Sequence, residues 1–289
     1  MIAAPQVSSR TSSRKLRLVR TGARLVAAGL GVAAAAYAGS AGYTWYRYGT
    51  PRPAANDEAD ALLDRVMPAY EVVERHRIRV RASADTTLAA AREQDLLASP
   101  VIRAIFNARA LALGSRPDER ARPRALIPQM LSLGWGVLVD VPGREIVMGA
   151  VTKPWEANPR FRAIGPADFA AFNEPEYVKI VWSLRVDSLG PDDSMFRTET
   201  RAVATDDFAR LKFRRYWALV SPGVALIRQA SLGPLKAEAE RRTSRERSGH
   251  HSRIAWKPLA QREQPRCATY EERRRERVAQ QRIRASHDG

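Results

Sequence analysis

The sequence has almost no cysteine: Cys267 is the only one among 289 residues. A single cysteine cannot form an intrachain disulfide, and one chain cannot build a thiolate metal cluster from it. The sequence also has no Asn-x-Ser/Thr glycosylation site. Disulfide stapling and a cysteine-based metal centre are therefore excluded, whereas the redox compartment stays open.

Motifs that name a reaction are absent as well. There is no G-x-S-x-G, no G-x-x-x-x-G-K-[ST], no H-E-x-x-H and no G-x-G-x-x-G at a strand-to-helix turn. His250 and His251 stand together in a polar tail without further ligands at metal-site spacing. We therefore predict no metal and no cofactor, and the catalytic residues, if there are any, stay unknown.

Acidic residues are absent from the amino-terminal end. Residues 1–56 carry eight Lys or Arg and no Asp or Glu, residues 57–240 carry 26 and 25, and residues 241–289 carry 14 and 6. The net charge of +17 thus belongs to the two ends of the chain. A nucleic-acid-binding domain would carry its basic excess on the folded surface, so we expect no nucleic-acid partner.

An uncharged run at residues 25–46 follows the basic amino terminus. It is long enough to cross the hydrocarbon core of a membrane, although its many Ala and Gly residues make it only weakly hydrophobic. Aromatic residues gather at its far end, as in an interfacial belt. We predict a single-pass anchor in the cell membrane, with the amino terminus in the cytoplasm and the domain outside it, because basic residues favour the cytoplasmic side.

The main alternative for this run is a cleavable signal peptide, because Ala36-Tyr37-Ala38 resembles a cleavage site. The aromatic belt beyond that site favours a retained anchor. The predicted organisation is a basic cytoplasmic segment at 1–24, a transmembrane helix at 25–46, a linker at 47–69, a folded domain at 70–240 and a basic, disordered tail at 241–289.

Alternating apolar and polar residues predict antiparallel strands in the folded domain. Residues 71–82 alternate, with Glu74 and His76 on the apolar side and four arginines on the other, which we interpret as a solvated face. Two hairpins follow, at 135–151 and 177–202, each with turn residues between its strands.

Capping residues predict where the helices of the domain begin and end. One helix should run over 85–97 from an Asp85 cap, and a second over 99–114 between Ser-Pro and Gly. A long amphipathic helix should run over 206–240. Ser221-Pro222-Gly223 should kink or break this last helix, because proline lacks the amide donor.

This order of elements resembles the START-like helix-grip fold of the SRPBCC superfamily, over residues 71–93, 135–151 and 177–228. The resemblance implies an α+β domain in which a curved antiparallel sheet wraps around a long C-terminal helix and leaves an apolar cavity. Members bind lipids, sterols, polyketides or hormones, and some are cyclases or aromatases. With its anchor, the chain also resembles an uncharacterised actinobacterial subgroup. The superfamily shares no catalytic motif, so no catalytic residue carries over.

We predict six ligand-binding residues: Glu74, His76, Trp135, Trp155, Trp182 and Trp217. On a concave sheet face, Glu74 and His76 would be polar groups in an apolar cavity, suited to orient a ligand or to act as an acid/base pair. Two structural explanations without a functional role stay open: this end of the strand is open to water, or the two residues form a buried pair whose hydrogen bonds are satisfied. The tryptophans fit a cavity wall and ordinary core packing equally.

Three functions remain open from the sequence. The first is a membrane-anchored protein that binds a hydrophobic small molecule or lipid, with the helix around residues 221–223 flexing as a lid. The second is a cyclase- or aromatase-type enzyme that uses Glu74 and His76 as acid/base groups. The third is a structural interaction protein whose cavity is filled by side chains.

Overall fold

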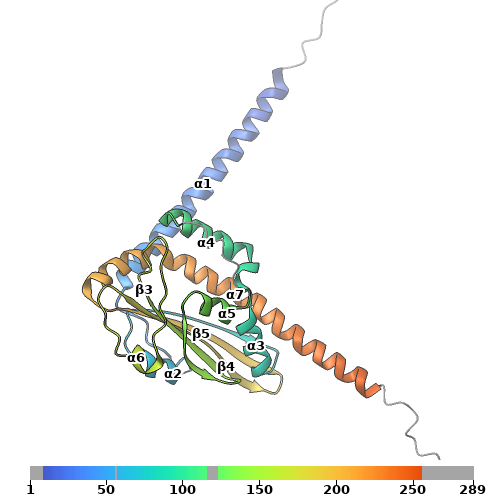
Figure 1. The fold of residues 1–289 in the computed structure, drawn as a ribbon. Coiled ribbons are helices and arrows are strands. Elements are labelled where there is room, and N and C mark those ends of the chain that lie inside the picture. Colours follow the sequence, from blue (N-terminus) through green and yellow to red (C-terminus); the bar gives the residue numbers. More distant parts are fainter. Residues whose placement is uncertain (1–8, 56, 116–122, 256–289) are drawn as a thin grey trace, which may run out of the picture. The chain divides into compact units, whose positions relative to one another are not determined.

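A computed structural model of the chain describes residues 9–55, 57–115 and 123–255. Figure 1 shows the elements in this order: α1 Ser9–Arg47, α2 Ala61–Val66, β1 Val72–Val80, α3 Ala84–Glu93, a 3-10 turn Leu96–Ala98, α4 Pro100–Leu113, α5 Leu126–Ser132, β2 Gly136–Val141, β3 Glu145–Thr152, α6 Pro166–Phe169, β4 Val178–Gly190, β5 Asp193–Ala204 and α7 Asp207–Ala255. The chain divides into one compact unit that ends at Thr243 and a second that begins at Ser244.

Five strands in the described part of the chain form one antiparallel sheet, in the order β1-β5-β4-β3-β2. Both predicted hairpins are present, as β2–β3 and β4–β5. Although β1 comes first in the chain, it pairs with the free edge of β5, so that Val72 lies opposite Ala202 and Val80 opposite Ser194. The predicted α+β order of antiparallel sheet and long C-terminal helix is thereby confirmed.

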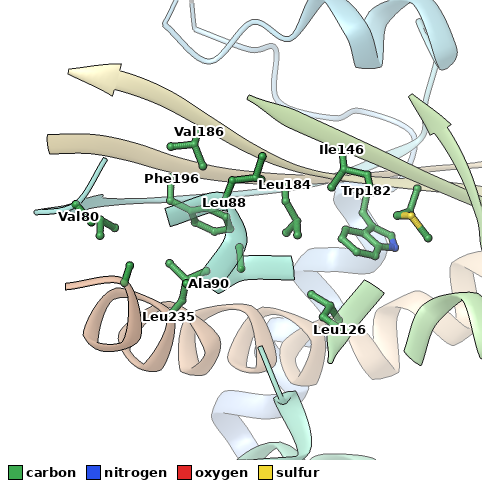
Figure 2. Close-up of a cluster of buried hydrophobic side chains, with 14 of the residues drawn as sticks. Val80, Leu88, Ala90, Leu126, Ile146, Trp182, Leu184, Val186, Phe196 and Leu235 are labelled. Carbon is green, nitrogen blue, oxygen red and sulfur yellow. The ribbon is translucent and has the colours of Figure 1, made fainter. Parts of the chain in front are cut away.

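The main hydrophobic core lies between one face of this sheet and α7 (Figure 2). Trp182, Leu184 and Val186 project from alternate positions of β4 into it, as the period-two pattern predicts. Leu235 enters from α7. Helix α3 closes one side of this core through Leu88 and its neighbours.

The opposite face of the sheet is also covered, by the short helices α2 and α6. Leu63 of α2 and Phe169 of α6 are completely buried against Val147 and Val181 of the sheet. Asp60 caps α2 by accepting hydrogen bonds from the first amides of the helix. Helix α2 falls within the stretch predicted as a linker, so this part of the linker is folded onto the sheet.

Helix α7 is continuous from Asp207 to Ala255, with Pro222 inside it, so the helix does not break at residues 221–223, and the predicted kink there stays a prediction. Gly223 explains part of this, because a Cβ there would come within 3.1 Å of the Ile105 side chain on α4. Contacts with a neighbouring helix thus hold the segment helical where local propensity disfavours it. The helix also continues past residue 240, while residues 256–289 lie outside the described part.

The cap of α3 differs from the prediction. Ser83, not Asp85, is the N-cap, with its hydroxyl accepting the amide of Thr86, and the helix ends at Glu93. The predicted second helix is confirmed as α4, which begins with proline and ends at Gly114 in the left-handed conformation.

Residues 25–46 form the second half of α1, so a helix is confirmed there. Within the described residues, however, we find no helix with a stretch that is both long and apolar enough for a membrane crossing, so the predicted span is not supported. Alanine and glycine dominate the run and contribute little hydrophobicity. The end of α1 is tied to the domain, because Tyr48 just beyond it donates a hydrogen bond to Glu71 at 2.6 Å.

Candidate functional site

Glu74 and His76 lie on the face of β1 that packs toward α7. Their neighbours at alternate positions, Ile78 and Val80, belong to the core between the sheet and α7. In the register of the sheet, Glu74 lies opposite Thr200 of β5 and His76 opposite Thr198. The strand alternation therefore places an acid, an imidazole and two hydroxyls on the inner face of one sheet edge.

Arg228 of α7 completes this group from the helix side. Its guanidinium donates to Thr200 Oγ1 at 2.7 Å and to Thr198 Oγ1 at 3.4 Å. Burial lowers the pKa of Arg228 to about 10, and the charge of Glu74 opposes that shift. We call these five residues the interior polar cluster: Glu74, His76, Thr198, Thr200 and Arg228.

His76 is not satisfied inside this cluster. Its Nε2 atom is buried and has no hydrogen-bond partner in the part of the chain that the structure describes. The distance from Nε2 to Glu74 Oε2 is 3.7 Å, too long for a hydrogen bond. The side chains of His76 and Glu74 keep 14% and 27% of their surface exposed, so the two residues are half-buried and do not form a satisfied buried pair. A buried nitrogen without a partner costs free energy and can accept or donate to a ligand.

Two of the predicted tryptophans lie next to the interior polar cluster: Trp182 contacts Arg228, and Trp135 contacts Trp182. The Arg228 guanidinium carbon lies 5.7 Å from the centroid of the Trp182 ring, within range of a cation–π interaction. Trp135, just before β2, meets Trp182 edge to face at 6.2 Å and stacks on Phe161 at 5.1 Å. Both tryptophans are buried, so they form an apolar wall next to a charged group.

Trp155 and Trp217 lie elsewhere. They pack with Phe213 of α7 against Val72, in a second aromatic cluster near the beginning of α7. Ile180 of β4 packs against this cluster and against the main core, so the two groups are neighbours but distinct. Glu74, His76, Trp135 and Trp182 are thus brought together, whereas the other two predicted residues are not part of this group.

Sequence reasoning missed Arg228 as a site residue. It is the only charged residue of α7 between Arg215 and Lys236. The sequence signal for Arg228 is its isolation: it is a single charged residue in a long uncharged part of a helix that packs against a hydrophobic core. The threonines were harder to find, because their role depends on the register between β5 and α7.

A pocket of about 150 Å³ lies on the opposite face of the sheet. The residues that line it come from the linker and from β1, β4 and β5: Glu58, Asp60, Arg75, His76, Arg77, Ser183, Arg185, Arg197, Thr198 and Glu199. Its lining is polar, and it includes none of the four predicted tryptophans. The pocket thus adjoins the interior polar cluster at His76 and Thr198, while most of its lining belongs to the face of the sheet opposite the predicted apolar cavity.

Several ion pairs surround this pocket on the face of the sheet that α2 covers. Arg75 bonds Glu199 at 2.9 Å, and Arg201 bonds the same carboxylate at 2.6 Å and Asp64 at 2.7 Å. Only 1% of the Arg201 side chain and 11% of the Arg75 side chain are exposed. The prediction that the arginine side of β1 is a solvated face is wrong at Arg75, because the linker and α2 fold over the sheet there.

Glu145, at the start of β3, is buried beside Asp60 on the same face. Burial, and secondarily the hydrogen bond and negative charge of Asp60, raise the pKa of Glu145 to about 8. Its Oε1 atom has no partner among the described residues. Glu145 is thus expected to hold a proton at neutral pH. Within the described ranges, no three His, Cys, Asp or Glu side chains are grouped to hold a metal.

No family profile matches the sequence, and no curated protein is significantly similar to it. Solved structures similar in fold include a hypothetical protein from Helicobacter pylori, with 9% identity, 58% of this chain and 87% of that chain covered, and a TM-score of 0.29. Norcoclaurine synthase from Thalictrum flavum has 14% identity, coverage of 66% and 96%, and a TM-score of 0.24. The ZhuI aromatase/cyclase from Streptomyces has 13% identity, coverage of 59% and 94%, and a TM-score of 0.23. These likenesses are too distant to support an inference of function, and the helix-grip arrangement rests on the topology described above.

Proposed function

We propose that the protein binds an apolar small molecule or lipid with an anionic head between the sheet and α7. The apolar part of the ligand would pack against Trp182 and Trp135, and its carboxylate or phosphate would meet Arg228. The observation that carries the proposal is that this inward-facing guanidinium bonds two hydroxyl groups and, among the residues that the structure describes, no carboxylate.

The physical argument is one of unpaired charge. A guanidinium taken out of water loses hydration free energy, which a bonded carboxylate normally offsets. Arg201 on the opposite face has two such carboxylates. Arg228 has only the field of Glu74, without a hydrogen bond among the described contacts. An anionic ligand head would form charge-assisted bonds with Arg228 and leave its tail in the apolar core.

A pair of matched probes tests this proposal. We would titrate the full chain with a dansyl-labelled fatty acid and with the corresponding fatty alcohol, and follow energy transfer from tryptophan. We expect the acid to bind about tenfold or more tightly than the alcohol, because only the acid pairs with the guanidinium. Arg228→Met should remove this preference, and Arg241→Met, on an exposed part of the same helix, should keep it. An equal preference in both variants would rule out the assignment.

A second function is favoured by one specific observation. Glu74 and His76 face each other at 3.7 Å in the interior, which suits a proton transfer to or from a bound molecule. Once native mass spectrometry has identified a retained hydrophobic ligand, its turnover can be followed. Glu74→Gln and His76→Asn should then each slow conversion by about a hundredfold or more if the pair is catalytic. Unchanged turnover in both variants would exclude the enzyme function.

The single-pass anchor at residues 25–46 and the extracytoplasmic domain stay predictions. Protease treatment of spheroplasts tests them directly. An outward domain is degraded in intact spheroplasts, whereas a protected domain would contradict the predicted orientation.

A further inference from the structure

The outer side of α7 carries an exposed apolar stripe. Phe208, Leu219 and Leu226 are 52%, 59% and 53% exposed. Their spacings of 11 and 7 residues are close to whole numbers of helical turns, so the three side chains lie along one line. Leu211 is also exposed beside this line. This stripe is distinct from the side of α7 that enters the core through Leu235.

Helix α4 extends the exposed apolar surface on one side of α7. Ile102 is its only fully buried residue, whereas Val101, Phe106 and Leu111 are exposed, Leu111 to 85%. Two contacts hold α4 against α7: the close approach of Ile105 to Gly223, and a hydrogen bond from Arg109 to the Tyr216 hydroxyl at 3.2 Å. A helix this apolar is normally covered.

The end of α1 lies along α7 in the same region. Tyr37 donates to the carbonyl of Leu219, and Arg214 donates to the carbonyl of Trp45 at 2.9 Å. Tyr43 and Tyr46 of α1 remain exposed. We call the exposed apolar residues of these three helices the outer helical face: Tyr43, Tyr46, Val101, Phe106, Leu111, Phe208, Leu211, Leu219 and Leu226.

The charge along the outer helical face is mostly basic, although the exposed Asp207 directly precedes Phe208. Residues 9–47, 100–113 and 208–237 contain no Asp or Glu. They do contain basic residues, among them Arg103 on α4 and Arg215, which is exposed near the apolar stripe of α7. Exposed Leu, Phe and Tyr side chains interspersed mainly with cations complement an anionic lipid surface, where the tails accept the apolar groups and the headgroups accept the charges.

We propose that the outer helical face docks on the surface of an anionic lipid bilayer, with α4 and α7 lying at the level of the headgroups. The inference does not depend on the interior site or on a membrane-spanning α1. When the face is docked, α7 has the bilayer on its outer side and Arg228 on its inner side. A bound lipid would then have only the thickness of one helix to pass.

The single cysteine makes a site-specific test possible in the full chain. In a Cys267→Ser background, Leu226→Cys on the outer helical face carries a nitrobenzoxadiazole dye, whose emission reports an apolar environment. Leu189→Cys is the matched control, because Leu189 is 52% exposed but lies near the end of β4, outside the face. The probes are vesicles of phosphatidylcholine alone and of phosphatidylcholine mixed with phosphatidylglycerol.

We expect a blue shift and an intensity gain of about twofold or more at position 226 with the anionic vesicles, a small response with the neutral ones, and none at position 189. In flotation, Leu219→Glu/Leu226→Glu should weaken binding about tenfold. If the labelled protein floats while the dye at 226 stays unchanged, attachment is through another segment and the proposal fails. A shift that follows protein concentration without vesicles would show that a second copy covers the face instead.

Discussion

Each face of the sheet carries an arginine, Arg201 buried and Arg228 half-buried, and the two arginines have opposite surroundings. Arg201 lies on the face that α2 and α6 cover, and only 1% of its side chain is exposed. It is bonded to two carboxylates and to the carbonyl of Met67. Arg228 reaches the face toward α7 and is bonded to two threonine hydroxyls. One guanidinium is fully neutralised by the protein, whereas the other lacks a bonded counter-ion among the described contacts.

The difference in bonded partners suggests different roles for the two arginines: Arg201 stabilises the fold, and Arg228 is available to bind an anionic ligand. A buried ion pair with complete hydrogen bonding holds segments together, and removing one partner leaves the other uncompensated. A buried charge without a bonded counter-ion weakens the fold and gains from a ligand of opposite charge. The comparison therefore predicts that replacing Arg201 lowers the stability of the fold, whereas replacing Arg228 does not.

The largest expected effect is on the structural arginine. Arg201→Met should lower the free energy of unfolding by about 3–5 kcal/mol, because it leaves the buried carboxylate of Glu199 with one partner fewer and the carbonyl of Met67 without its donor. Urea denaturation at neutral pH measures the change. A loss below about 1 kcal/mol would show that Arg201 is no more than a surface pair, and the contrast with Arg228 would disappear.

The next effect concerns Glu145, whose pKa is raised from 4.5 to about 8 in the folded protein. Between these two values the folded state binds the additional proton, so stability falls as the pH rises. Glu145→Gln removes this dependence, and above pH 8 it should stabilise the protein by about 3 kcal/mol. Below pH 4.5 the variant and the parent should unfold alike. If the free energies of unfolding of the parent and of Glu145→Gln change with pH in parallel across this range, the raised pKa is contradicted.

A smaller effect of opposite sign is expected at the interior polar cluster. Without ligand, Arg228→Met should leave stability unchanged or raise it by about 1 kcal/mol, because it removes a charge that no carboxylate compensates by a hydrogen bond. Thermal unfolding of the delipidated protein measures this. A loss as large as that of Arg201→Met would assign a structural role to Arg228 and weaken the proposed ligand site.

The smallest effect should come from an exposed pair on β1. Arg79 pairs with Asp193, and 68% of its side chain is exposed. Arg79→Ala should leave the urea midpoint of unfolding nearly unchanged, since exposed ion pairs contribute little. The same denaturation series provides this value, and it calibrates the other three. A cost comparable with that of Arg201→Met would mean that burial does not decide the strength of these pairs.

Much of the fold is visible in the sequence because it depends on local patterns. The period-two alternation of residues 178–186 depends only on which side chains tolerate water, so the strand and its buried side are found at once. Proline and glycine mark the ends of α4 because their backbone limits are intrinsic. The helix does not break at Pro222, because packing against α4 and α1 overrides a local preference.

The candidate site was predicted in part. The inward orientation of Glu74, His76 and Trp182 is predictable from strand alternation, because alternate residues of a strand lie on the same face as its apolar residues. Arg228, Thr198 and Thr200 do not, because a helix residue meets two strand residues only when the angle and register of α7 across β5 are known. Trp155 and Trp217 were grouped with the site by residue type, and distance in space separates them from it.

The sequence by itself determined which segments are strands and helices, where charge is absent, and that no common catalytic motif is present. Those features depend on side-chain chemistry and on neighbours a few residues away. The tertiary structure decided which charges are compensated, since partners such as Arg201 and Asp64 are 137 residues apart. Electrostatic compensation depends on distances of a few ångströms in space, and only the folded chain sets those distances.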